Sequence, residues 1–232
     1  MTDYLFPPPA VPALAIRGSA QRFPIRRIFC VGRNYEAHAR EMGGAVEREQ
    51  PFYFTKSAQH YLPSGSSLPY PPGTSDCHYE MELVACIGKA SFNIPEEEAL
   101  SHVFGYACGL DMTRRDLQTR AKDKKLPWDL GKDFEHAAVL SEIATASAIG
   151  HPHAGGIELR VNGVTRQSSD IGLMIHSVPA LIAHLSQFYH LQPGDIIFTG
   201  TPEGVGPVAP GDRLEGSIAG VGTIALSIGP AE

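Results

Sequence analysis

The sequence has few of the features found in exported, membrane-bound or disulfide-linked proteins. Its 232 residues include only four cysteines, at positions 30, 77, 86 and 108, and no two of them have the C-x-x-C spacing of a redox or zinc site. Three of the four lie within apolar runs, so we expect buried thiols rather than bridges or metal ligands. No apolar run is long enough to span a bilayer, and the N-terminus lacks the charged and then apolar layout of a signal peptide. We therefore predict a cytoplasmic protein without a membrane partner.

The sequence also lacks concentrated positive charge and nucleotide-binding motifs. It contains 19 basic and 25 acidic residues, which give a net charge of -6, and it has no long basic cluster. Because phosphate binding depends on concentrated Lys and Arg, we expect no nucleic-acid partner. The Gly-rich segment DIIFTGTPEGVG (195–206) has neither the G-x-G-x-x-G order of a dinucleotide site nor the Gly-Lys-Ser/Thr ending of a P-loop. Its backbone and the Thr201 hydroxyl could approach an anion, although a plain hairpin turn is the default for such a segment.

Turn-forming residues are plentiful and divide the chain into short apolar segments. The 24 glycines and 19 prolines favour a strand-rich α+β architecture with few helices, and the chain has no internal repeat. The expected strands cover residues 27–31, 52–55, 80–87, 104–111, 157–161, 195–199, 212–218 and 220–228. The expected helices cover residues 36–42, 96–103, 113–122 and 178–188. Residues 1–22, rich in Pro and Ala, predict an extended N-terminal arm, and residues 23–232 predict one larger domain.

The chain does contain a pair of glutamates on one face of an expected strand. In HYEMELV (78–84), Glu80 and Glu82 are two residues apart, so their side chains point to the same side of a strand. A third acid, Asp111, ends the apolar run FGYACGLD (104–111) and can join them from a neighbouring strand. Carboxylates gathered in this way need a proton at raised pKa or a cation between them. Three hard oxygen ligands favour Mg2+, Mn2+ or Ca2+, whereas a solvated strand face is the common alternative for an isolated E-x-E.

Two further segments carry side chains suited to proton transfer and anion binding. In CVGRNYEAHAREM (30–42), His38 and Glu41 are three residues apart, so on a helix the carboxylate can orient the imidazole and favour its protonated form. A general base has this arrangement, although an exposed ion pair is the alternative. Lys132, in WDLGKDFEH (128–136), could stabilise an oxyanion or bind a carboxylate, or could equally be a solvated surface lysine.

Six motifs in a fixed order resemble the fumarylacetoacetate hydrolase family. They are VGRNYEAHAREM (31–42), FTKSA (54–58), HYEMELVACIGK (78–89), GYACGLDMTRRDLQ (105–118), GKDFEHAAV (131–139) and IIFTGTPEGVG (196–206). The similarity extends from about residue 23 to residue 228. Within the family, the chain most resembles the enzymes that hydrolyse fumarylpyruvate in gentisate degradation.

This resemblance implies a fold, an assembly and a set of site residues. The fold is a mixed β-roll or β-sandwich with residues 23–232 as its catalytic domain, and the assembly is a homodimer with one Mg2+ or Mn2+ per subunit. The implied metal ligands are Glu80, Glu82 and Asp111. The implied catalytic residues are His38 and Glu41, on a short lid helix, and Lys132. Residues that line the site are Lys56, Arg115, Gln118 and Thr201, and Arg33 is a further candidate to hold a substrate carboxylate.

The chemistry of these residue types fits hydrolysis of a 2,4-dioxo acid. The C1 carboxylate and C2 oxygen of an acylpyruvate can chelate a metal held by three carboxylates. His38 would take a proton from water, hydroxide would attack the C4 carbonyl near Lys132, and breaking the C3 to C4 bond would release pyruvate enolate. Fumarylpyruvate would give fumarate and pyruvate. Two alternatives remain at this point: decarboxylation or tautomerisation of oxaloacetate-like acids, and metal-dependent binding of an oxo acid without turnover.

Overall fold

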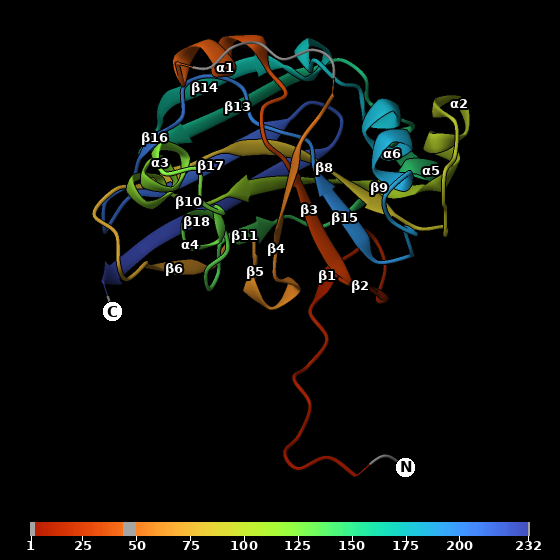
Figure 1. Cartoon of the computed structure of the whole chain (residues 1–232), viewed down its shortest axis with the longest axis horizontal. Coiled ribbons are helices and arrows are strands. Elements are labelled where there is room, and N and C mark those ends of the chain that lie inside the picture. Colours follow the sequence, from red (N-terminus) through yellow and green to blue (C-terminus); the bar gives the residue numbers. More distant parts are fainter. Residues whose placement is uncertain (1–2, 44–49, 232) are drawn as a thin grey trace.

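A mixed eight-stranded sheet forms the centre of the computed structural model, which describes residues 3–43 and 50–231. Its strands follow the order β4-β3-β15-β8-β9-β11-β5, and β12 joins by pairing with β9 (Figure 1). Two pairs, β3 with β15 and β5 with β11, are parallel, and the other pairs are antiparallel. The strand bounds are β3 (Arg27–Val31), β4 (Tyr53–Lys56), β5 (Tyr61–Pro63), β8 (Met81–Ile87), β9 (Val103–Asp111), β11 (Ala138–Leu140), β12 (Ala144–Thr145) and β15 (Asp195–Phe198).

A second sheet of five strands encloses the main core together with the first. Its order is β14-β13-β17-β18-β6. Apolar side chains from both sheets, such as Leu83 and Leu159, belong to one buried cluster, so the two sheets pack against each other. The strand bounds are β6 (Ser67–Tyr70), β13 (Gly156–Val161), β14 (Val164–Asp170), β17 (Arg213–Ile218) and β18 (Gly222–Ala231). The predicted strand-rich α+β fold of the β-roll or β-sandwich type is confirmed.

Two small sheets and six short helices complete the described structure. The small sheets are β1 (Ala13–Ala15) with β2 (Arg22–Pro24), and β10 (Thr113–Arg114) with β7 (Cys77–Tyr79) and β16 (Gly206–Pro207). The helices are α1 (Glu36–Glu41), α2 (Glu96–Ala99), α3 (Arg115–Asp123), α4 (Asp129–Lys132), α5 (Ala146–Ile149) and α6 (Val178–Ser186). In residues 3–43 and 50–231, no helix has the length and apolar character needed to cross a membrane. All four cysteines are buried and free, as predicted.

Strand pairing overrides local helix propensity at one predicted boundary. The helix expected over residues 113–122 begins only at Arg115, because Thr113 and Arg114 pair with β7. The polar strand β14 was not predicted, since its sequence VTRQSSD lacks the alternation of a half-buried strand. It lies at an edge of the second sheet, where it pairs with β13 alone. The first departure follows from a tertiary contact, whereas β14 pairs with its neighbour in sequence across the turn Asn162-Gly163.

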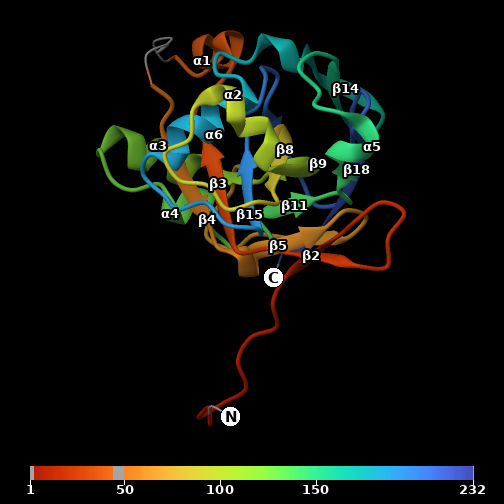
Figure 2. The same cartoon turned by 90° about the vertical axis from the view of Figure 1, so that its right-hand side faces the viewer.

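The N-terminal arm is extended over its first part and then folds back. Figures 1 and 2 both show the start of the described chain projecting away from the body. Further along, β1 pairs with β2, and Leu14 is fully buried in an apolar cluster with Phe23 and Ile25. The division of the chain at residue 22 stays a prediction.

Asn34 fastens the loop after β3 to the segments that flank the site. Its amide nitrogen donates hydrogen bonds to the backbone carbonyls of His176 (2.9 Å) and Thr199 (2.8 Å), and its oxygen accepts from the backbone N–H of His176 (2.7 Å). The side chain is fully buried. We expect Asn34→Ala to lower the free energy of unfolding by about 2–4 kcal/mol, because it removes the partner of the buried Thr199 carbonyl and of two half-buried backbone groups of His176.

Chemical denaturation measures this loss. Gln59→Ala removes an exposed amide and is the control, with an expected change below about 0.5 kcal/mol. Equal stability of the two variants would mean that the buried amide does not hold this loop.

Candidate active site

Two neighbouring strands bring the three predicted carboxylates together. Glu82 lies on β8, Glu80 stands just before that strand, and Asp111 ends β9. The Asp111 backbone N–H donates to the Glu80 carbonyl (2.9 Å), which holds the start of β8 and the end of β9 side by side. One carboxylate oxygen of each residue lies within 4.8 Å of the others, and all three side chains are buried. The solvated-face alternative for Glu80 and Glu82 is therefore excluded.

Three cations surround this triad of carboxylates, and all are buried. The Lys132 ammonium, at the end of α4, donates to Glu80 Oε2 (2.8 Å), Asp111 Oδ2 (2.7 Å) and the Thr113 hydroxyl (2.7 Å). Lys56, at the end of β4, forms an ion pair with Asp111 Oδ1 (2.7 Å). Arg115, at the start of α3, pairs with Glu80 Oε1. These cations neutralise Glu80 and Asp111 but leave Glu82 aside.

The pKa values reflect this uneven distribution of charge. Burial alone would raise the pKa of Glu80, but the charges of Lys132 and Arg115 lower it below its usual range. Burial raises the pKa of Glu82 well above its ordinary value, and the charges of Asp111 and Glu80 raise it further. The Glu82 carboxylate accepts a hydrogen bond from the backbone N–H of Gly200 (2.6 Å). A further cation at the triad would relieve this repulsion, so three hard oxygen ligands in this state fit Mg2+ or Mn2+.

The backbone N–H that contacts Glu82 belongs to a position that requires a glycine. Its φ is +96°, in the left-handed region that glycine adopts readily. A Cβ atom there would lie 2.7 Å from Cβ of Asn34, which is too close for an undisturbed contact. The close approach of these two loops therefore aims a backbone donor at the triad.

A buried histidine and a partly exposed glutamate lie side by side on α1. His38 Nδ1 lies 3.1 Å from Glu41 Oε2, and the other oxygen of Glu41 accepts from the Gly204 backbone N–H (3.0 Å). His38 is only 4% exposed, whereas the Glu41 side chain is 34% exposed, so the pair differs from a fully exposed ion pair. Burial lowers the pKa of His38. The hydrogen bond and the charge of Glu41 raise that pKa, as the sequence predicts, but burial has the larger effect and favours the neutral imidazole.

The remaining predicted residues divide into two groups. Gln118 is buried and accepts a hydrogen bond from Arg115 (2.6 Å), and the buried Thr201 hydroxyl accepts from Gln167 (2.8 Å). Gln118 therefore contacts the triad through Arg115, and Thr201 contacts the side chain of Gln167. Arg33 is not part of the carboxylate cluster, and its guanidinium lies over the Phe52 ring at 5.7 Å.

Two buried residues that support the site were not predicted. Thr113 accepts a hydrogen bond from Lys132, and its place two residues after Asp111 was the available signal. Gln167 accepts from the Met81 backbone N–H (3.0 Å) and donates to Thr201, so it links β14 to β8. The Asn162-Gly163 turn was the local signal that could have placed Gln167 on a strand.

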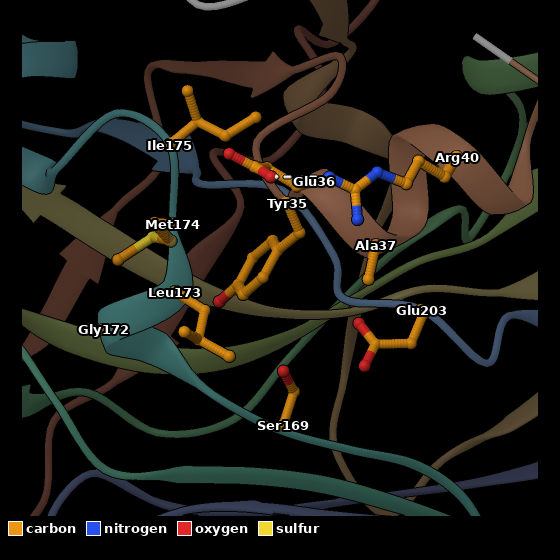
Figure 3. Close-up of a pocket in the computed structure, with 10 residues that line it drawn as sticks. All are labelled: Tyr35, Glu36, Ala37, Arg40, Ser169, Gly172, Leu173, Met174, Ile175 and Glu203. Carbon is orange, nitrogen blue, oxygen red and sulfur yellow. Dashed lines mark hydrogen bonds and ion pairs between the residues drawn. The ribbon is translucent and has the colours of Figure 1, made fainter. Parts of the chain in front are cut away.

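A separate cavity of about 580 Å³ opens on the outer side of α1 (Figure 3). Figure 3 shows the Tyr35 ring pointing into it, with Glu36 and Arg40 of α1 on the rim. Arg40 donates to Glu36 (3.0 Å). None of the triad or the His38 pair lines this cavity, so the chemistry indicated by the buried charges lies elsewhere.

Fold and site together define a class: a strand-rich scaffold whose buried acidic triad suits a divalent ion, with a histidine base nearby. A comparison with protein families matches residues 27–228 to "Fumarylacetoacetate (FAA) hydrolase C-terminal". The chain belongs to this family.

Individual relatives and solved structures agree with that assignment. The chain is 53% identical over 193 residues to a fumarylpyruvate hydrolase from Ralstonia sp, which covers 82% of this chain and 100% of the relative. It is 42% identical over 203 residues to a mitochondrial oxaloacetate tautomerase of Homo sapiens, covering 88% of this chain and 91% of the relative. The crystal structure of fumarylpyruvate hydrolase from Pseudomonas aeruginosa in complex with Mn2+ and pyruvate superimposes with a TM-score of 0.96, at 50% identity, over 98% of this chain and 100% of that one.

Proposed function

We propose that the protein is a divalent-metal-dependent hydrolase of the carbon–carbon bond in acylpyruvates, and that fumarylpyruvate is its substrate. Water and fumarylpyruvate would give fumarate and pyruvate. The observation that carries this proposal is the buried acidic triad of Glu80, Glu82 and Asp111 together with the buried His38 that Glu41 contacts on α1. The similarity to a fumarylpyruvate hydrolase at 53% identity supports the choice of substrate.

Each group has a defined part in this proposal. When bound at the triad, Mg2+ or Mn2+ supplies a Lewis acid for the oxo-acid end of the substrate and for the charge of the departing enolate. Glu41 accepts the Nδ1 proton of His38, which leaves Nε2 free to take a proton from water. Hydroxide then adds to the C4 carbonyl, the C3 to C4 bond breaks, and a proton returns to the enolate carbon.

Lys132 and Arg115 set the charge of the site. All three N–H groups of Lys132 are used by Glu80, Asp111 and Thr113, so a contact with a substrate oxyanion requires the exchange of one of them. Arg115 and Gln118 lie on one face of α3 and are positioned to hold a substrate carboxylate. Lys56 and Thr201 complete the proposed lining, Lys56 through Asp111 and Thr201 beside Gly200.

Tautomerisation or decarboxylation of oxaloacetate is the second candidate function. The similarity to oxaloacetate tautomerases at 42% identity favours it, and both reactions stabilise an enolate of the same oxo-acid group. It requires no attack by water, so the His38–Glu41 pair is less needed there. The same pair argues against simple binding without turnover, because binding needs only the ion and an anion pocket.

A comparison of substrates tests the proposed function. We expect metal-dependent release of pyruvate from fumarylpyruvate at a kcat/KM at least about 100-fold above that for oxaloacetate, and loss of turnover when a chelator removes the ion. Pyruvate from hydrolysis or decarboxylation is measured with a coupled lactate dehydrogenase assay, and tautomerisation of oxaloacetate is followed by the absorbance of its enol, each with and without Mg2+. Turnover of oxaloacetate alone would support the second candidate, and turnover unaffected by the chelator would contradict both.

We further infer a homodimer that acts in the cytoplasm. The projecting arm exposes large apolar side chains, with Leu5 97% and Phe6 73% exposed, and a second copy of the chain would cover them. Light scattering on the purified protein gives the mass of the assembly.

A further inference from the structure

Helix α3 carries two cationic side chains on one face, Arg115 at its start and Lys122 near its end. Arg115, Gln118 and Lys122 follow one another at i, i+3 and i+7, so they share one face of the helix. Arg115 contacts Glu80 at the triad, and Gln118 contacts Arg115. Lys122 is then the outermost of the three, roughly 10 Å further along the helix axis. The helix therefore leads from the proposed metal site towards a lysine that the proposed reaction does not yet use.

Aromatic rings place the Lys122 ammonium beside the site. It lies 5.1 Å from the centroid of the Trp128 ring, and Trp128 makes an edge-on contact with Phe52 at 5.5 Å. Arg33 lies over the other ring of this pair, Phe52. Two cations thus sit on two touching aromatic rings, in the arrangement expected of cation–π contacts.

A cavity connects these rings with the catalytic lysine. It has a volume of about 400 Å³, and its lining includes Phe52, Phe54, Trp128 and Lys132. The Lys132 ammonium lies 5.0 Å from the Phe54 ring on one side and contacts Glu80 and Asp111 on the other. A substrate held at the triad by its oxo-acid end can therefore extend its acyl group along an apolar wall of aromatic rings.

Two cations at the outer end of this wall have no ion-pair partner among the described residues. Lys56, Lys132 and Arg115 each pair with a carboxylate of the triad. Neither Arg33 nor Lys122 forms an ion pair with a carboxylate of the described chain, including the exposed Asp129 that lines the cavity. Burial and the charges of Arg115, Lys132 and Arg33 lower the pKa of Lys122 to about 8, against the opposing charge of Glu80. A carboxylate from a ligand would satisfy both cations.

We propose that Lys122, with Arg33 beside it, binds the distal carboxylate of a dicarboxylic acylpyruvate and so selects an anionic acyl group over a neutral one. This inference rests on the proposed function and specifies its substrate class. The aromatic wall contacts the planar double bond and carbonyl of the acyl group, and the two cations bind the terminal carboxylate. An ordinary helix-end lysine would instead extend into solvent, whereas Lys122 is half-buried against Trp128.

Two substrates that differ only at the far end test this selection. In crotonylpyruvate, a methyl group replaces the distal carboxylate of fumarylpyruvate. We expect Lys122→Met to lower the ratio of kcat/KM for fumarylpyruvate to that for crotonylpyruvate by about 10- to 100-fold, mainly through KM. Lys122→Arg keeps the charge and should retain most of the ratio. Fumarate binding to the metal-loaded protein, measured by calorimetry, should weaken in Lys122→Met by a similar factor.

Lys124→Met is the matched control. Lys124 is exposed, follows Lys122 by two residues at the C-terminal end of α3 and carries the same charge. Its ratio should stay within about twofold of that of the unaltered protein. An unchanged ratio in Lys122→Met, or an equal loss for both substrates, would overturn the inference. If the unaltered protein cleaved neither substrate, the proposed function itself would fail, which is a different result from an unchanged ratio.

Discussion

Replacement of Glu82 by glutamine is expected to abolish metal-dependent turnover and, at the same time, to make the metal-free protein more stable. Glu82 is the carboxylate of the triad that no cation neutralises, and its pKa is raised by burial and by the charges of Asp111 and Glu80. A raised pKa in the folded state means that stability is present at low pH and is lost as the pH rises through that value. At pH 8 the raised pKa of Glu82 therefore destabilises the metal-free fold. Glutamine removes the charge and can still accept the Gly200 N–H.

The metal reverses the order of stability of the two proteins. Loss of one of three ligands should weaken Mn2+ binding at least about 100-fold, since even residues that only support a ligand can be worth that much. At a metal concentration 100 times its dissociation constant, the unaltered protein gains about 2.7 kcal/mol of unfolding free energy. That gain corresponds to a rise in Tm of about 5–10 °C for a chain of this length. The Tm of Glu82→Gln should barely respond to the same ion.

Thermal unfolding with and without Mn2+, together with the pyruvate assay, measures both effects. Glu97→Gln is the control, because Glu97 is exposed on α2 and is not part of the triad. A metal-induced rise in Tm that is equal in Glu82→Gln and in the unaltered protein would show that the triad is not where the ion binds.

The sequence predicts those parts of the fold in which local pattern and tertiary environment agree. The strand expected over residues 27–31 has the bounds observed for β3, and the run 104–111 corresponds to β9 with one more residue. Both are apolar segments buried in the large sheet. Strand β14 was not predicted because its residues are mostly polar. It nevertheless follows β13 in a hairpin whose two-residue turn, Asn162-Gly163, has positive φ values of 51° and 78°.

The residues of the site likewise divide into those that local periodicity predicts and those that only tertiary contacts bring into place. The spacing of Glu80 and Glu82, and that of His38 and Glu41, follows from strand and helix periodicity, so both pairs were visible in the sequence. Gln167 reaches Thr201 only through the sheet pairing of β14. Lys122 lies between these cases, since its spacing from Arg115 and Gln118 was visible but the aromatic rings that hold it come from β4 and the start of α4.

Replacement of His38 by glutamine separates binding from water activation. The glutamine amide can still donate to Glu41, but it has no basic nitrogen to accept a proton from water. We expect kcat for fumarylpyruvate to fall by about 100- to 10,000-fold, whereas binding of Mn2+ and of oxalate, a mimic of the pyruvate enolate, changes by less than about threefold. Turnover is followed by pyruvate release, and binding by calorimetry. His153→Gln, at an exposed loop position, is the control.

The pH dependence provides an independent test of the same role. The active base is neutral His38, and burial lowers its pKa below the usual 6.5, so the acid limb of kcat/KM should lie below pH 6.5. That limb should disappear in His38→Gln, whose residual activity depends on hydroxide and rises with pH. Full activity of His38→Gln, or an acid limb that survives the substitution, would assign proton transfer to another group. Weakened oxalate binding with unchanged kcat would instead make His38 a ligand-binding residue, because a base that acts only on water contributes nothing to the affinity for an inhibitor that contains no scissile bond.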